Sequence, residues 1–169
     1  RNFCSLVLLL LRVGAPCLRV FFKTQWDSTG RTPWTDTTQN GTDLLQIFKP
    51  LPYEKNNVKS GHRSTWGLSL IIKVLLQSFV STPELVLALE RLRELRKKLC
   101  DATTLRIDAS DFEGFWTDAC NALTLFGTKS KEFDKVKKDV QKSRRFLLPE
   151  LKGCANQDRD ILSLIQSSK

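Results

Sequence analysis

The N-terminal stretch RNFCSLVLLLLRVGAPCLRVFF constrains the fold most, because its apolar residues surround a helix instead of lining one side of it. Phe3, Leu6, Leu10 and Leu18 recur at helical spacing, and Leu8, Leu9 and Leu11 fill the other side. A helix that is apolar all round has to be buried. The stretch therefore predicts the central helix of a bundle. Pro16 predicts a kink or a break in it.

The chain that follows alternates between polar loops and amphipathic helices. Residues 24–42 and 53–65 are rich in Gly, Pro, Asp, Asn and Thr, which is typical of loops. Between them, Asp43–Phe48 is predicted to form a short helix that KPLP stops. Trp66–Phe79 has helical apolar spacing, and so does a longer helix that begins after Thr82 and ends near Cys100.

The second half of the chain predicts three more helices. DASDFEGFW begins the first of them, with Ser110 and Glu113 as a capping box, and Gly127 ends it. A basic helix is expected over Lys131–Arg145, with Pro149 ending or bending it. Ile161–Ile165 lie in a last short helix.

No segment alternates with a period of two, so we expect an all-α fold. The short turns favour an antiparallel bundle of about four to five core helices, with a long polar loop after the first helix. We expect residues 1–127 to form the core, 128–152 a basic helix packed on it or extending it, and 153–169 a terminal helix or linker. Because the 169 residues contain no methionine, we expect a piece of a longer, multidomain protein.

The net charge of +9 permits an acidic partner such as RNA, an anionic membrane or an acidic protein. Basic residues concentrate in 91–106 and 129–152, and four acidic residues lie in 108–118. No aromatic residues interleave with the lysines as base-stacking platforms would. We interpret these runs as solvated helix faces, with RNA binding as the alternative.

Few residues suggest catalysis or metal binding. The five cysteines show no CxxC spacing and no even pairing, which favours a reducing, cytoplasmic location without cofactor or metal. His62 is the only histidine and lies in a predicted loop. Asp108, Asp111 and Glu113 are explained by a helix cap.

A secreted four-helix signalling protein remains an alternative, because the leucine run resembles a short signal peptide and Asn40–Thr42 is a glycosylation sequon. The run itself is too short to span a bilayer.

One arginine stands out in RELRKKLCDA, residues 93–102. Arg96 falls beside the Leu92–Leu99 apolar stripe, and an arginine on the covered side of a helix is costly without a partner. It could be half of a catalytic pair, a nucleic-acid contact or a structural ion-pair partner. Glu113 and Asp118 are guessed as its acidic partners.

Three segments together resemble HEPN domains, in the branch found in the DAZ-interacting RING ubiquitin ligase. They are LLRVGAPCLRVFF, WGLSLIIKVLL and ALERLRELRKKLCDATTLRIDASDFEGFWTDACNALTLFG. The matching positions are Gly14, Leu18, Arg19, Phe22, Trp66, Leu68, Ser69, Leu70, Ile71, Asp111, Phe112, Glu113, Phe115 and Trp116. The resemblance covers roughly residues 3–127 and implies a helical bundle.

Many HEPN domains are metal-independent RNases that use an arginine and a histidine four to six residues later, often across a dimer. The resemblance aligns Arg96 with that arginine and Lys97 with a usual asparagine. The histidine position falls on Cys100, Asp101 or Ala102, with Ala102 the favoured match. RNA cleavage without metal needs a proton acceptor with a pKa near neutrality, which histidine supplies. Asp101 is a poor substitute among cationic neighbours. We expect a vestigial motif without RNase activity.

The function expected from the sequence is therefore a non-catalytic HEPN-like interaction or oligomerisation module. Its partner would be another protein or a second copy, with no membrane and no small-molecule substrate. The alternative is an RNA-binding domain, degenerate as an RNase, whose phosphate contacts come from Arg93, Arg96, Lys97, Lys98 and Arg106.

Overall fold

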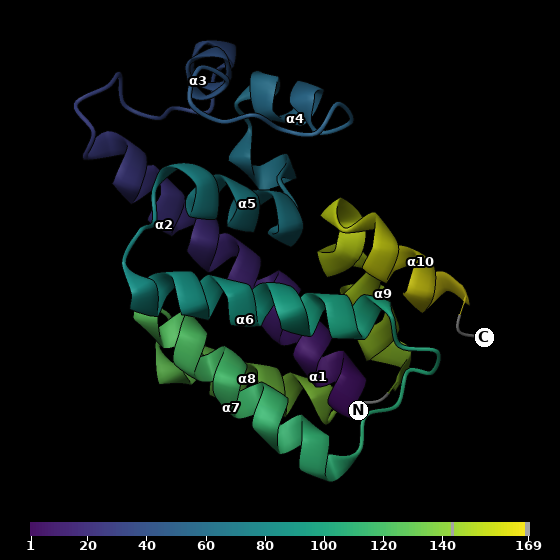
Figure 1. The fold of residues 1–169 in the computed structure, drawn as a ribbon. Helices are drawn as coiled ribbons and strands as arrows, with labels where there is room; N and C mark the ends of the chain where they lie inside the picture. Colours follow the sequence, from purple (N-terminus) through teal and green to yellow (C-terminus); the bar gives the residue numbers. More distant parts are fainter. Residues whose placement is uncertain (143, 168–169) are drawn as a thin grey trace.

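The computed structural model describes residues 1–142 and 144–167, and every regular element within them is helical. The predicted all-α bundle is thus confirmed. α6 (Pro83–Cys100) and α7 (Ala109–Leu125) form an antiparallel pair at the front of Figure 1. α5 (Leu68–Ser78) packs on α2 and α6, and the N-terminal helix runs behind these elements.

The N-terminal helix is the centre of the core, as predicted. It is continuous over Asn2–Asp27 and consists of α1 (Asn2–Leu8), a π-helical segment η1 (Leu9–Gly14) and α2 (Ala15–Asp27). Proline has no backbone N–H, and its ring crowds the carbonyl four residues earlier. The wider π turn lies directly before Pro16, so the helix adjusts at that point without breaking.

By length and composition alone, Asn2–Asp27 could cross a membrane, which corrects the expectation that the apolar run is too short. A buried core helix and a signal sequence both meet that criterion. In this fold, 67% of its most apolar window is buried. A methyl group added at Gly14 would lie 3.4 Å from Leu123 of α7, so this glycine lets two helices approach closely.

α8 (Ser130–Val140) and α9 (Arg144–Cys154) cover the other side of the central helix. The prediction of one basic helix over Lys131–Arg145 is wrong. α8 ends in a turn in which the amide of Lys142 donates to the Asp139 carbonyl. Pro149 lies inside α9 instead of ending a helix. Arg12 joins the central helix to both elements through Asp139, at 2.9 Å, and Glu150.

The long segment after the first helix contains more structure than predicted. α3 covers Thr38–Leu44, so the expected helix at Asp43–Phe48 is wrong. The side chains of Thr37 and Asn40 form a reciprocal capping box that begins α3, a signal overlooked in the polar sequence. α4 (Lys55–Ser60) follows, and the two short helices pack together outside the bundle in Figure 1.

The start of α7 also differs from the prediction. α7 begins at Ala109 after Asp108, and neither Ser110 nor Glu113 makes a capping hydrogen bond. Both lie exposed within the helix, since the extended residue that precedes it is Asp108. Its other end agrees with the sequence: Gly127 has a φ of 100°, the left-handed geometry that favours glycine after a helix.

Candidate functional site

The candidate site is built around Arg96, near the end of α6. Its side chain is only 16% exposed, as expected for an arginine beside the apolar stripe. Its Nε and Nη2 atoms donate to the two carboxylate oxygens of Asp158 at 2.7 and 2.9 Å. Nη2 also donates to Asp160 at 3.1 Å. This fork-to-carboxylate pairing is the strongest geometry an arginine can adopt.

Asp158 also caps a helix, because it directly precedes α10 (Arg159–Ser167). Its carboxylate also accepts from the backbone N–H of Ile161 at 3.3 Å, as a helix N-cap does. The Asp158 side chain is 2% exposed, whereas that of Asp160 is 71% exposed. One buried carboxylate therefore begins α10 and holds it against the end of α6.

A polar cavity of about 590 Å³ lies beside this ion pair. It separates α4 and α5 from the start of α10, and Tyr53, Asn57, Ser69 and Gln157 contribute to its wall. Arg96 lines it too, and its Nε and Nη2 atoms donate to Asp158 and Asp160. A phosphate that used these two nitrogens would have to displace a carboxylate from the arginine.

The surroundings of Arg96 keep its guanidinium charged. Burial alone would lower the pKa of Arg96, but the hydrogen bonds and negative charge of Asp158 outweigh burial and raise it. Burial raises the pKa of the neighbouring Cys100 thiol to about 11, against the opposing effect of Arg96. Near pH 7 the site therefore holds a charged guanidinium beside a neutral thiol.

Cys100, Asp158 and Asp160 lie close enough together to bind one metal ion, with their ligand atoms within 4.8 Å of one another. Metal binding needs a thiolate and free carboxylate oxygens. Here the thiol is protonated and Arg96 occupies both carboxylates. The donor set therefore fits a structural ion pair better than a metal centre.

The guessed partners of Arg96 are wrong. Glu113 and Asp118 lie exposed on α7, whereas the actual partners come from the far end of the chain. Ala102, at the expected histidine position, is half-buried in the loop after α6.

The other predicted anion-binding residues remain at the surface. Arg93 lies 3.8 Å from Glu90, and Lys98 stacks over the ring of Phe115 at 4.7 Å. Lys97 and Arg106 are exposed. The structure thus separates Arg96, which is engaged inside the chain, from four cations that face solvent.

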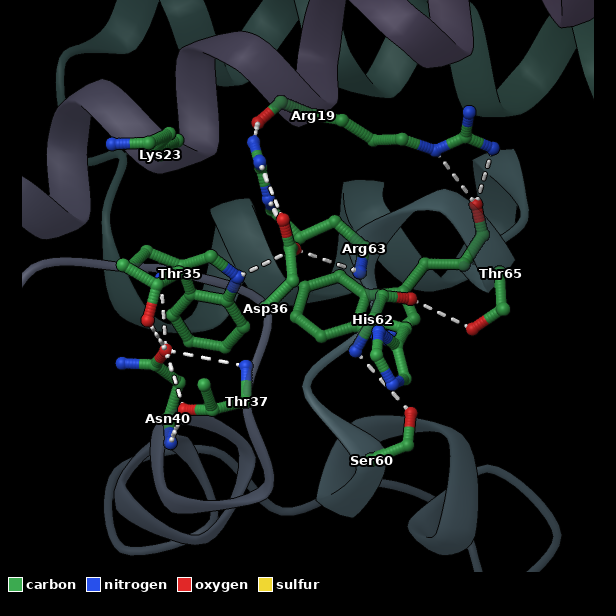
Figure 2. Close-up of polar contacts among 12 residues, drawn as sticks. Arg19, Lys23, Thr35, Asp36, Thr37, Asn40, Ser60, His62, Arg63 and Thr65 are labelled. Carbon is green, nitrogen blue, oxygen red and sulfur yellow. Dashed lines mark hydrogen bonds and ion pairs between the residues drawn. The ribbon is translucent and has the colours of Figure 1, made fainter.

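A second polar cluster, absent from the sequence prediction, ties the 28–67 segment to the bundle (Figure 2). Arg63 donates to both carboxylate oxygens of Asp36, at 2.8 and 3.1 Å, and to the Arg19 carbonyl at 3.2 Å. Trp34 donates its indole N–H to Asp36 at 3.0 Å. Arg19 in turn donates to the Trp66 carbonyl at 2.7 and 3.1 Å.

Aromatic rings pack beneath this cluster. Trp26, Trp34 and Trp66 are essentially fully buried around Phe22. His62 sits at the exposed edge of the cluster, where its backbone N–H donates to Ser60. The polar cluster and the rings together hold the 28–67 segment against the bundle. His62 contributes hydrogen bonds through its backbone.

No family model matches the chain, and neither a curated protein nor a solved structure matches it significantly.

Replacing Arg96 by methionine is expected to destabilise the fold by about 3 kcal/mol, because it leaves the buried Asp158 carboxylate without its ion-pair partner. Urea unfolding should show this loss. The matched control is Asp160→Asn, which removes the exposed carboxylate of the same cluster and should change stability by less than about 0.5 kcal/mol. Equal effects of the two variants would contradict a buried ion pair.

The Asp36–Arg63 pair predicts a pH dependence. The hydrogen bonds from Arg63 lower the pKa of Asp36 to about 2, so its carboxylate stabilises the fold above pH 4 and loses this effect as the pH falls towards 2. Asp36 is 37% exposed, so solvent screening reduces the expected loss in Asp36→Asn to about 1 kcal/mol at pH 6.

Urea unfolding of wild type and Asp36→Asn from pH 6 to pH 3 checks this, with the exposed Asp134→Asn as control. The difference between wild type and Asp36→Asn should shrink below pH 4. A difference that stays constant over this range would show that the ion pair does not contribute.

Proposed function

We propose that this chain is a non-catalytic, HEPN-like helical module that self-associates within a larger intracellular protein. The observation that carries the proposal is the engagement of Arg96 by Asp158. An arginine that served RNA cleavage would have to direct its donors towards a phosphate. Here a carboxylate of the same chain takes that place.

The surroundings of Arg96 support the absence of catalysis. General acid–base chemistry needs groups that exchange protons near neutral pH. Ala102 has no such group, and burial keeps the Cys100 thiol protonated. All five cysteines are unpaired, which favours an intracellular, reducing location over the secreted alternative.

The outer face of α6 and α7 is the surface that best fits self-association. Leu87 and Leu125 are 49% and 43% exposed there. Two shallow hollows of about 270 and 370 Å³ lie between the helices, and Leu87 and Arg91 line both. Asp118 lies on the α7 side of the smaller hollow.

This face is complementary to itself in charge. A two-fold arrangement that lays α6 of one copy along α7 of the other would bring Arg91 opposite Asp118 twice. It would also cover the exposed leucines, and such self-complementarity is what a symmetric dimer requires.

Replacing both Leu87 and Leu125 by glutamate should abolish the dimer, because it places buried charges at the centre of the proposed contact. Light scattering after size exclusion should give twice the 19.3 kDa monomer mass for the wild type and the monomer mass for the variant. Val20→Glu is the control, because Val20 is also exposed, at 64%, but lies on α2. A monomeric wild type at millimolar concentration, or an equal effect of Val20→Glu, would contradict the proposed interface.

RNA binding is the second candidate, and the exposure of Arg93, Lys97, Lys98 and Arg106 favours it. α8 also carries exposed lysines. Phosphate contacts through these residues would weaken steeply with salt.

We expect a labelled single-stranded RNA to remain intact without metal, because no neutral-pH acid–base group lies beside Arg96. A titration at two salt concentrations, with wild type and Lys97→Ala/Lys98→Ala, separates the two candidates. Salt-sensitive binding that the double variant loses would favour RNA recognition over the interaction module. Cleavage that Arg96→Met removes would contradict the claim that the motif is vestigial.

A further inference from the structure

An apolar cavity lies away from Arg96, where the start of α1 meets the end of α8, α9 and α10. Its volume of about 610 Å³ is within the range of small-molecule sites. Buried side chains of the core form its floor: Phe3, Val140, Leu147, Leu151 and Ile165. Cys4, Leu105 and Leu148 add a partly buried apolar wall.

The loop between α6 and α7 forms one side of this cavity and is tied to the N-terminal helix. The side-chain amide of Asn2 donates to the Ile107 carbonyl at 2.9 Å. Figure 1 shows the N-terminus beside this loop. The hydrogen bond from Asn2 to Ile107 holds the neighbouring Leu105 and Arg106 near Phe3. This side of the cavity is therefore attached to the N-terminal helix.

Among the described residues that line the cavity, the charged ones are all basic: Arg1, Arg106 and Lys142. Lys142 is paired with Asp139 at 2.8 Å. In the described part of the chain, no carboxylate lies within ion-pair distance of Arg1 or Arg106. The apolar pocket is thus lined by two arginines that have no ion-pair partner among the described residues.

We propose that this cavity binds a single-chain anionic amphiphile of the fatty-acid class. The alkyl chain would occupy the space over Phe3, Leu148 and Leu151, and the carboxylate would lie at Arg106 and Arg1. Guanidinium groups bind carboxylates through paired N–H donors, and an apolar cavity favours the chain. A neutral lipid would leave both arginines unpaired, and a short anion would leave the apolar wall empty.

Calorimetric titration of the full chain with dodecanoate, below its micelle concentration, tests the proposal. We expect one saturable site. The methyl ester of the same acid, which keeps the chain and removes the charge, should bind about tenfold more weakly, as should acetate, which keeps the charge and lacks the chain. Equal binding of acid and ester would overturn the proposal in favour of nonspecific apolar binding, and no saturable binding would overturn it outright.

Two variants assign the site. Arg106→Gln should weaken dodecanoate binding about tenfold and leave binding of the ester unchanged, which a loss of folding could not do. Cys4→Phe should fill the cavity and weaken both ligands. Arg31→Gln, at an exposed arginine in the loop after α2, is the matched control and should change neither. If Arg31→Gln weakens dodecanoate as much as Arg106→Gln does, the effect is one of net charge and the site is wrong.

Discussion

Burial of the Asn2–Asp27 helix determines how the rest of the chain is arranged. Leu6 and residues 8–10 are completely buried, and each such leucine contributes roughly 1.5–3 kcal/mol when it leaves water. One covering layer could not bury a helix that is apolar on all sides. α5, α7, α8 and α9 therefore all pack against it, and α6 packs on α5 and α7. Arg12 interrupts the apolar surface and is tolerated because Asp139 and Glu150 meet it there.

Among the described residues, Arg12, Arg63 and Arg96 each join elements that are distant in sequence through an ion pair. The partners of Arg12 and Arg96 include carboxylates that would be costly to bury alone, since Asp139 and Asp158 are 13% and 2% exposed. Arg96 is the arginine that the HEPN resemblance associates with RNA cleavage. Asp158 binds the Nε and Nη2 atoms of Arg96 with both of its carboxylate oxygens, so Arg96 attaches the start of α10 to α6. The interaction-module proposal rests on that role.

The features that depend on the periodic spacing of apolar residues could be predicted from the sequence. The central helix, α6, the all-α class and the covered position of Arg96 could all be read from the spacing of apolar residues. Ion-pair partners that only folding brings together could not be predicted from that spacing. Nothing local indicates that Asp158 meets Arg96 or that Asp36 meets Arg63, since 62 and 27 residues separate them. Short polar helices were also missed, although the Thr37–Asn40 capping box was a readable signal for α3. Pro149 was expected to end or bend the basic helix, whereas it lies inside the separate helix α9.

The central claim is that the Arg96–Asp158 pair fixes α10 to the bundle and so removes the arginine from chemistry. Hydrogen exchange of the α10 backbone amides, in wild type and in Arg96→Met, tests this most directly. The account predicts that α10 in the wild type is protected together with α6, and that Arg96→Met releases α10 to fast exchange while α6 and α7 stay protected. An α10 that exchanges rapidly in the wild type, or that keeps its protection without Arg96, would contradict it.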